Sequence, residues 1–278
     1  MAPRLPLVKP DVGSSLLKRA CPKTVRLHSS FSPSNPSSLA TSQCLITGAS
    51  RGIGLAIATR VSALGASCIL VGRDGSSLNK ARQTVLDASS SGAQQVSVRT
   101  RVGDVGERDF WESVGRDLKD VDVLINAAGV AHYSLLMATK PELVERVVRT
   151  NLMGPVWAGQ IVGRNMVRRR KGCIINISSL LGVKGGKGSV AYAASKAGLL
   201  GLTRSLAAEI GPSNVRVNAI VPGYVETQMT DARDDARNTI PLNRFGQAEE
   251  VADAAIFLAS NPYANNCVLN LDGGLSAV

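Results

Sequence analysis

The stretch that decides the fold is Gln43-Cys-Leu-Ile-Thr-Gly-Ala-Ser-Arg-Gly-Ile-Gly54, in which an apolar run leads into three glycines. Residues 44–47 predict a buried strand, and the apolar period through Ile53, Ile57 and Val61 predicts a helix. A glycine-rich turn between a strand and a helix offers free backbone N–H groups and a positive dipole end to a phosphate. The spacing is GxxxGxG rather than the commonest GxGxxG, and its place at a strand–helix junction favours a dinucleotide site.

The same alternation of strand and helix continues to the end of the chain. Further strands are expected at residues 67–71, 96–101, 121–125, 173–177, 215–221 and 267–270. Helical periodicity covers residues 53–64, 77–89, 109–119, 141–170, 189–210 and 248–259. Strands that alternate with helices predict a parallel sheet covered on both faces. We therefore expect an α/β fold, a single doubly wound Rossmann-type domain over residues 41–278 with a seven-stranded parallel sheet.

Composition limits what else the chain does. Hydrophobic residues make up 44% of the sequence and aromatics only 4%, so Val, Ile, Leu and Ala must build the core. No apolar run approaches the roughly 18 residues of a membrane span. The five cysteines form no CxxC pair and the two histidines stand far apart, which predicts no metal site, no disulfide scaffold and a reducing compartment. Basic residues are not interleaved with aromatics, so nucleic acid is not an expected partner.

Residues 1–40 have a composition unlike the rest of the chain. They carry six basic residues against one acid, and Ser and Pro are frequent towards their end. A segment that is basic, poor in acids and rich in serine is typical of an organelle transit peptide, and no continuous apolar stretch marks a secretory signal. We therefore predict import into mitochondria. The alternative is that residues 1–40 are a disordered basic tail, in which case we expect a cytoplasmic protein.

Charge at the end of the second predicted strand bears on whether NADP(H) or NAD(H) is the cofactor. An acid at this position would bind the ribose hydroxyls and repel a 2′-phosphate, but Gly72 stands here and Arg73 follows it. Arg51, in the glycine-rich turn, adds a second guanidinium, and guanidiniums suit phosphate well. We therefore predict NADP(H) rather than NAD(H). The alternative is that Arg73 is a solvent-facing loop residue beside Asp74.

Tyr192 and Lys196 form the pair of residues most suggestive of chemistry. Residues four apart lie one above the other on a helix, so the ammonium would lie beside the phenol. A nearby positive charge stabilises a phenolate and lowers the tyrosine pKa from about 10, which suits proton transfer. The alternative is an aromatic core residue next to a solvated lysine.

Together these features resemble the short-chain dehydrogenase/reductase family over residues 42–278. The motifs that carry the resemblance, in chain order, are TGASRGIG at 47–54, Asp104-Val105, Asn126-Ala-Ala-Gly129, Thr150-Asn151-Leu152, Ser179, Tyr192-x-x-x-Lys196, Pro222-Gly-Tyr-Val-Glu-Thr227 and Asp272-Gly-Gly274.

The resemblance implies a role for each matching position. Tyr192 is expected to give a proton to the substrate carbonyl, Lys196 to lower its pKa and hold the nicotinamide ribose, and Ser179 to bind the carbonyl. Ser178 competes with Ser179, but the spacing of thirteen residues to Tyr192 favours Ser179. Asn151 would complete a water-linked proton relay. The positions expected to bind the cofactor are Gly48, Ala49, Ser50, Arg51, Gly52, Ile53, Gly54, Arg73, Asp104, Val105, Asn126, Ala127, Gly129, Tyr192, Lys196, Pro222, Gly223, Val225 and Thr227.

Within the family the chain is most similar to 3-oxoacyl-[acyl-carrier-protein] reductases. The likeness implies NADPH-dependent reduction of a 3-oxoacyl group, a homotetramer, and docking of an acidic acyl carrier protein on basic residues near the substrate entrance. Those residues would be Arg168, Arg169, Arg170 and Lys171, although Ser213 replaces a second basic position. The alternative for this cluster is a solvated helix end, where cations suit the dipole. Alternative functions are a reductase of ketones, quinones or secondary metabolites, and a non-catalytic NADP(H)-binding scaffold.

Overall fold

A computed structural model describes residues 39–89, 96–228 and 234–278 of the chain. Within these residues seven parallel strands form one sheet, in the order β3-β2-β1-β4-β5-β6-β7. The strands are β1 (Gln43–Thr47), β2 (Ser67–Gly72), β3 (Val98–Val102), β4 (Val123–Asn126), β5 (Gly172–Ile177), β6 (Val215–Pro222) and β7 (Val268–Leu271). Every predicted strand is present, with ends displaced by one or two residues. The predicted doubly wound α/β fold is confirmed.

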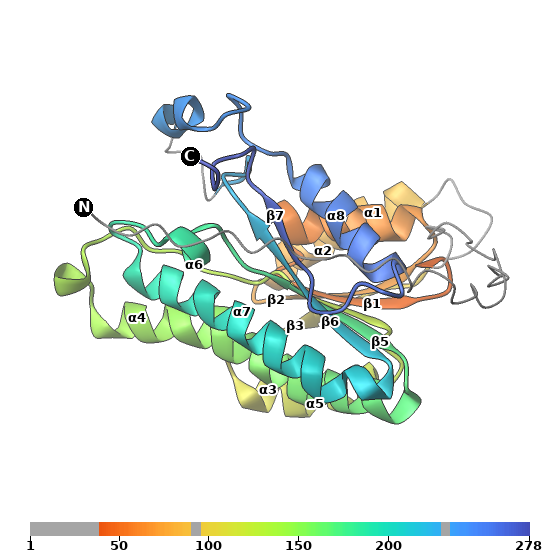
Figure 1. The fold of residues 1–278 in the computed structure, drawn as a ribbon. Helices are drawn as coiled ribbons and strands as arrows, with labels where there is room; N and C mark the ends of the chain where they lie inside the picture. The colour runs from red at the N-terminus through yellow and green to blue at the C-terminus, as the bar shows by residue number, and fades with distance from the viewer. Residues whose placement is uncertain (1–38, 90–95, 229–233) are drawn as a thin grey trace, which may run out of the picture. The chain divides into compact units, whose positions relative to one another are not determined.

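Helices cover both faces of the sheet (Figure 1). They are α1 (Gly52–Ala63), α2 (Gly75–Ser89), α3 (Arg108–Val114), α4 (Pro141–Val148), α5 (Gly154–Arg169), α6 (Leu181–Lys184), α7 (Val190–Ile210) and α8 (Ala248–Ser260), with shorter 3₁₀ turns at η2 (Gly115–Leu118), η3 (Leu136–Ala138), η5 (Gly211–Ser213) and η6 (Asp234–Thr239). α1, α2 and α8 pack on one face, and α3, α5 and α7 pack on the other.

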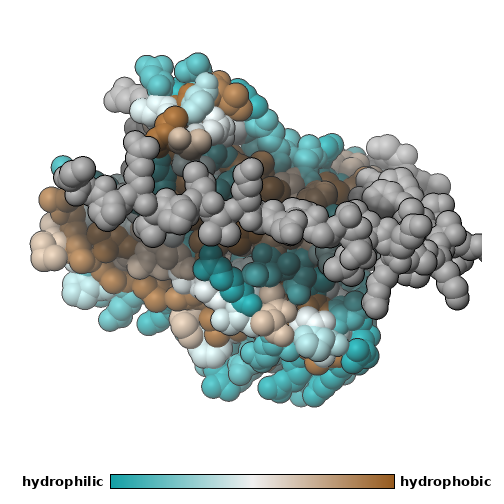
Figure 2. Space-filling view, viewed as in Figure 1, coloured by the Kyte–Doolittle hydropathy of each residue, from teal (hydrophilic) through white to brown (hydrophobic). Residues whose placement is uncertain are grey.

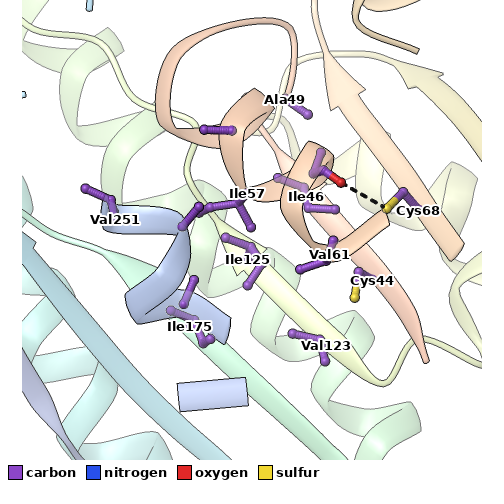
Figure 3. Packing of buried hydrophobic residues seen from close by; sticks show 14 of the residues in the cluster. Cys44, Ile46, Ala49, Ile57, Val61, Cys68, Val123, Ile125, Ile175 and Val251 are labelled. Atoms are coloured by element: carbon purple, nitrogen blue, oxygen red, sulfur yellow. Dashed lines mark hydrogen bonds between the residues drawn. The ribbon is translucent and has the colours of Figure 1, made fainter. Parts of the chain in front are cut away.

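Side chains of each strand alternate between these two layers, as the pleat requires. In β1, Cys44 and Ile46 belong to the cluster under α1, α2 and α8, whereas Leu45 belongs to the opposite cluster. Figure 3 shows the first cluster, in which Ile46 lies close to Ile57 of α1. Burying a Leu or Ile side chain stabilises the fold by about 1.5–3 kcal/mol. The free cysteines Cys44, Cys68 and Cys173 are buried here and fill space in the core, and Cys267 packs against the same cluster while partly exposed.

The structure corrects one predicted helix. Residues 141–170 do not form a continuous α-helix, because a π-helical turn, η4 (Arg149–Met153), separates α4 from α5. Pro155 explains the break, since proline has no N–H to give to the carbonyl four residues earlier, at Asn151. A π turn accommodates such a missing hydrogen bond, and π turns often occur at functional sites. The predicted helix 109–119 is likewise split, ending as α3 before Gly115 and continuing as η2.

Residues 1–38 lie outside the described part of the chain, so the predicted transit peptide stays a prediction. In residues 39–89, 96–228 and 234–278, no helix is both long enough and apolar enough to span a bilayer.

Candidate active site

Two adjoining cavities open at the carboxyl edge of the sheet. In a doubly wound sheet, ligands bind at this edge, where the strand order reverses. The larger cavity, which we call the groove, has a volume of about 870 Å³ and runs past the ends of β1, β2 and β3. The smaller one, which we call the pocket, has a volume of about 170 Å³ and lies beyond the ends of β5 and β6. Ile53, Ala127, Gly129, Tyr133 and Thr227 line both.

The glycines of the first turn bring the backbone close to the groove. Gly48 has a φ of +66°, and a Cβ there would lie 2.7 Å from the Cα of Ala128. A Cβ at Gly54 would overlap the carbonyl of Gly48. Neither position tolerates a side chain, so close packing of the turn accounts for both glycines. No side chain caps the start of α1, which leaves its first N–H groups free to bind an anion such as a diphosphate.

Positive side chains line part of the groove. Arg51 and Arg73 are both among its lining residues, and Arg73 directly follows Gly72 at the end of β2. The Arg51 guanidinium donates a 3.0 Å hydrogen bond to Gln228, and Arg73 lies 3.9 Å from Asp104. The guanidiniums and the free N–H groups of the glycine turn can bind the phosphates of a nicotinamide dinucleotide.

Thr47 holds the segment between the two cavities in place. Its hydroxyl accepts hydrogen bonds of 3.1 Å from the N–H groups of Ala127 and Ala128. Asn126, which precedes them, is buried and donates to Asn176 of β5. Asn126 was predicted to bind the cofactor, but it lines neither cavity and acts by supporting this segment. The predicted site also omitted Thr47, a polar residue that ends an apolar strand.

Tyr192, Ser179 and Lys196 meet in the pocket. The Ser179 hydroxyl acts as a hydrogen-bond partner that lowers the pKa of the Tyr192 phenol, so the two groups lie where both could bind one carbonyl oxygen. Ser178 has a different partner, because its hydroxyl donates a 2.7 Å bond to the carbonyl of Lys196. Both serines line the pocket, but this bond occupies the Ser178 hydroxyl, which favours Ser179 as the serine that faces a substrate.

Lys196 is buried, with 4% of its surface exposed. Its ammonium donates a 2.8 Å hydrogen bond to the carbonyl of Ile177 and lies 5.7 Å from the centre of the Tyr192 ring. A Cβ on Gly129 would come within 3.5 Å of this ammonium, so the lysine reaches the boundary of pocket and groove. An ammonium has three N–H donors, which leaves capacity for ribose hydroxyls.

Burial dominates the protonation of both residues. It raises the pKa of Tyr192 to about 12, with the Ser179 hydrogen bond acting in the opposite direction and Tyr133 adding to the rise. Burial lowers the pKa of Lys196 to about 8. The predicted lowering of the tyrosine pKa by Lys196 does not appear among these causes. A raised pKa keeps the phenol protonated at neutral pH, which is the form that proton donation requires.

Asn151 is fully buried in the π turn η4 and lines neither cavity. Its amide nitrogen donates to the carbonyl of Val130 and to the Ser195 hydroxyl, which in turn donates to the carbonyl of Tyr192. Asn151 therefore connects the segment after β4 to the helix that carries Tyr192. Its predicted part in a water-linked relay stays a prediction.

The other residues predicted to bind the cofactor either line one of the two cavities or lie outside both. Those that line the groove or the pocket are Gly48, Ser50, Arg51, Gly52, Ile53, Gly54, Arg73, Asp104, Val105, Ala127, Gly129, Pro222, Gly223, Val225 and Thr227. Ala49 is buried and lines neither. The sequence prediction missed Leu181, Tyr224 and Leu275 as pocket walls. Leu275 follows the Asp272-Gly-Gly274 motif, but nothing in the sequence places it across the pocket from the residues after β5.

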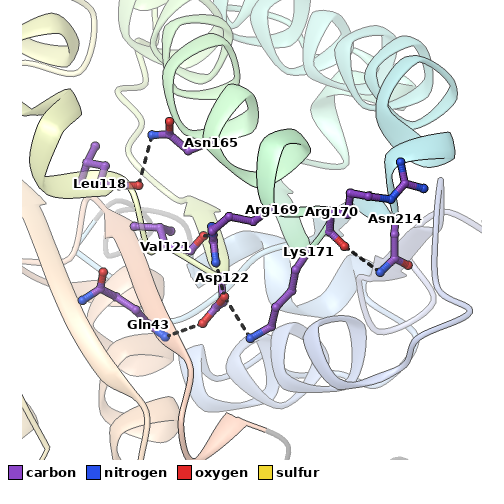
Figure 4. A network of polar contacts seen from close by, with 9 residues as sticks. All are labelled: Gln43, Leu118, Val121, Asp122, Asn165, Arg169, Arg170, Lys171 and Asn214. Carbon is purple, nitrogen blue, oxygen red and sulfur yellow. Dashed lines mark hydrogen bonds and ion pairs between the residues drawn. The ribbon is translucent and has the colours of Figure 1, made fainter.

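The basic cluster lies at the opposite edge of the sheet, before the start of β5 (Figure 4). Asp122 accepts a 2.8 Å hydrogen bond from Arg169 and lies 3.1 Å from the ammonium of Lys171. Arg170 donates to the carbonyl of Pro212, and Arg168 is exposed. Two of the four cations thus neutralise a largely buried carboxylate, which supports a structural role for them.

Comparison with known proteins agrees with this geometry. The family model for short chain dehydrogenases matches residues 42–238. The chain belongs to the short-chain dehydrogenase/reductase family and is an oxidoreductase of that family.

The chain is also similar to individual proteins of this family. The chain is 38% identical to 3-oxoacyl-[acyl-carrier-protein] reductase of Rattus norvegicus over 84% of this chain and 97% of that one. It is 39% identical to carbonyl reductase family member 4 of Danio rerio, over 83% and 96% of the two chains. Among solved structures, one from Agrobacterium tumefaciens, named as a candidate 2-deoxy-d-gluconate 3-dehydrogenase and containing NADP, matches with a TM-score of 0.80, 31% identity, and 88% and 100% coverage.

Proposed function

We propose that the protein reduces 3-oxoacyl groups on acyl carrier protein to 3-hydroxyacyl groups, with NADPH as reductant, in mitochondrial type II fatty acid synthesis. The observation that carries the proposal is the meeting of Ser179, Tyr192 and Lys196 in a largely apolar pocket beside the groove. The names of the relatives of Rattus norvegicus and Thermotoga maritima, both 38% identical, support the choice of substrate.

Each of the three polar residues of the pocket would have a separate role in reducing a carbonyl group. Ser179 and Tyr192 would each donate a hydrogen bond to the substrate oxygen, where negative charge develops in the transition state. Bound NADPH would supply a hydride to the carbonyl carbon. Tyr192 would give its proton to the oxygen, which becomes the product hydroxyl, and the buried cation of Lys196 would stabilise the resulting phenolate. Solvent then returns a proton to the tyrosine.

Arg51 and Arg73 support NADPH as the preferred form of the cofactor. Both guanidiniums line the groove, and no acid occupies the position of Gly72. The NADP in the related structure is consistent with this preference. Asp104, which pairs with Arg73, would have to share that guanidinium with the 2′-phosphate.

An apolar rim beside the pocket supports an acyl substrate. Tyr133 lines the pocket, and the η3 segment that follows exposes Leu135, Leu136 and Met137, the last to 92%. Brown, hydrophobic surface is visible at this end of the domain in Figure 2. A thioester-linked chain would find apolar contacts both inside the pocket and at its edge.

Carrier docking and assembly are linked proposals. Within one chain, Arg168 and Arg170 lie at the amino end of β5, whereas the pocket opens at the carboxyl edge. A carrier bound there would deliver its acyl group to the pocket of another subunit, which requires the proposed homotetramer. The exposed face of α7 carries small residues that would let another helix approach closely: Ala194, Ala197, Gly201 and Ala208.

The test is a substrate panel on the purified protein without residues 1–40. With NADPH, a 3-oxoacyl-[acyl-carrier-protein] should be turned over with a higher kcat/KM than any simple ketone or quinone. The carbonyl reductase relatives, at 35–39% identity, make ketones and quinones the second candidate substrates, and faster turnover of a quinone would select that function. Tyr192→Phe should lower kcat by about 10²–10⁴-fold. Unchanged activity in this variant would overturn the assignment of Tyr192 as the proton donor, whereas a wild type without activity on every substrate would support the scaffold alternative.

The destination of the protein is tested separately. Residues 1–40, fused to a fluorescent protein, should carry it into mitochondria. Retention of the fusion in the cytosol would contradict the proposed location and leave the proposed reaction untouched.

A further inference from the structure

Two segments far apart in the sequence contribute apolar side chains to the wall of the pocket. One is α6, where Leu181 lines the pocket, and the other is the end of the chain, where Leu275 does. Figure 1 shows α6 and the C-terminal end at the same edge of the sheet. Leu275 also packs against a small buried cluster of Leu180, Leu200, Ala219 and Val221. The two walls therefore share one apolar contact.

Lys184 joins these two walls. It ends α6, one helical turn after Leu181, and its ammonium donates hydrogen bonds to two main-chain oxygens of the last residues. The distances are 2.9 Å to the oxygen of Leu275 and 2.7 Å to that of Val278. The lysine backbone is itself fixed, because its N–H donates to the carbonyl of Leu180.

Asp272 is a second polar anchor of the last residues. Its carboxylate accepts hydrogen bonds from the N–H groups of Gly274 and Ser276, and its carbonyl accepts one from Leu275. These bonds fix the start of the segment 272–278. Lys184 fixes its far end, and the two anchors together determine where the Leu275 side chain lies in the pocket.

We propose that Lys184 is a positioning residue that holds Leu275 against the pocket and thereby sets how well an apolar substrate chain is bound. The proposal rests on the proposed function for the kind of substrate, a 3-oxoacyl thioester whose chain extends away from the reacting carbonyl. The chain would lie between Leu181 and Leu275, and the lysine fixes the separation of these two walls. Lys184 does not touch the reacting atoms.

The experiment compares Lys184→Met with the wild type on 3-oxoacyl thioesters of increasing chain length, attached to a small thiol rather than to carrier protein. For the longest chains KM should rise about 3- to 10-fold, as expected for losing part of one apolar side-chain contact with the substrate. For the shortest chain both kcat and KM should stay within about twofold, because the lost contact is remote from the reaction. Lys184→Arg should restore the wild-type series.

Lys187→Met is the matched control, since Lys187 is an exposed lysine three residues after Lys184 whose ammonium makes none of the hydrogen bonds found in the described part of the chain. It should behave as the wild type. Leu275→Ala should reproduce the Lys184→Met effect, and the double variant should show no further loss, because both changes remove the same wall.

Two results would overturn the proposal. One is an unchanged chain-length series in Lys184→Met, and the other is an equal fall in kcat on every substrate. If the wild type does not reduce 3-oxoacyl thioesters, the proposed function fails, and alkyl ketones of increasing length then test the role of Lys184 on their own.

Discussion

The side chain of Asn151 exchanges two hydrogen bonds with the main chain of Val130. The amide nitrogen donates to the Val130 carbonyl at 2.9 Å, and the amide oxygen accepts from the Val130 N–H at 2.8 Å. The same nitrogen donates to Ser195 at 3.1 Å. One buried side chain thus fixes the segment between groove and pocket to the helix that carries Tyr192 and Lys196.

Asn151→Asp should therefore lower the free energy of unfolding by about 1–3 kcal/mol, because it removes two donors and buries a carboxylate. Chemical denaturation monitored by circular dichroism measures this change. Asn165→Asp on α5 is the control, since the Asn165 amide makes a long, 3.5 Å hydrogen bond to Leu118. Equal losses in the two variants would show that the Val130 contacts carry no special weight.

The neighbouring serines should respond differently to removal of their hydroxyls. Ser179→Ala takes away the group that bonds to Tyr192, so kcat/KM should fall about 10²–10³-fold. Ser178→Ala removes a buried bond to the Lys196 carbonyl, so it should reduce stability by about 1 kcal/mol with a smaller effect on rate. Steady-state kinetics and thermal denaturation of both variants test the assignment. A larger rate loss for Ser178→Ala would reverse it.

Burial of Lys196 should make stability depend on pH. Its pKa in the folded protein is about 8, below the unfolded value of about 10.4, so the charged form opposes folding at lower pH. The free energy of unfolding should rise from pH 8 towards pH 10 because the unfolded chain binds more protons in this range. Tyr192 acts in the opposite direction only above about pH 10, since its pKa is raised.

Lys196→Met removes this dependence and so isolates it. We compare the free energy of unfolding of the variant minus that of the wild type at two pH values. This difference should be more favourable to the variant at pH 7 than at pH 10, by about 1–3 kcal/mol. Denaturation of both proteins without cofactor, across this pH range, measures the difference. A difference independent of pH would contradict a lowered lysine pKa.

Arg73→Ala should change the choice of cofactor. Loss of a guanidinium from a phosphate should raise KM for NADPH about 10- to 100-fold and leave KM for NADH within about twofold. Arg108→Ala removes an equal charge from an arginine that is not among the groove-lining residues, and it should alter neither value. Equal effects of Arg73→Ala on both cofactors would place this side chain away from the 2′-phosphate.

Asp122 should stabilise the fold at pH values at which its carboxylate is ionised. Burial disfavours its carboxylate, but hydrogen bonds from Arg169, from the N–H of Gln43 and from Lys171 lower its pKa overall. A lowered pKa contributes stability that is present above the unfolded value of about 3.9 and is lost as pH falls through the folded value.

Asp122→Asn should accordingly lose about 1–3 kcal/mol at pH 6, and less of it at pH 3. Turnover at the distant pocket should be unchanged. Arg169→Ala should share the stability loss, whereas Arg168→Ala, at an exposed position, should affect only turnover of a carrier-bound substrate. A loss of stability in Arg168→Ala would contradict this division of the cluster.

Local patterns explain why most of the sheet was predictable from sequence. Continuous apolar runs such as residues 173–177 mark buried parallel strands, and the glycine turn after Thr47 needs only local geometry. The break at η4 was missed, although Pro155 gives a local signal for it. Contacts between distant residues could not be predicted: Arg169 with Asp122, Ser178 with the carbonyl of Lys196, and Lys184 with Leu275. The spacing to Tyr192 favoured Ser179 over Ser178, and the fold adds a reason that the sequence lacks, because the Ser178 hydroxyl bonds to the Lys196 carbonyl.

The π turn at Arg149–Met153 has a consequence for the register of the whole layer behind it. Such a turn holds one residue more than an α-helical turn, and each residue of an α-helix advances the chain by about 100°. Deleting one residue there would rotate α5 by that angle and carry Ala158, Val162 and Met166 away from the sheet. The number of residues in this turn is thus constrained by two features, the hydrogen bonds of the Asn151 amide and the packing of the buried face of α5.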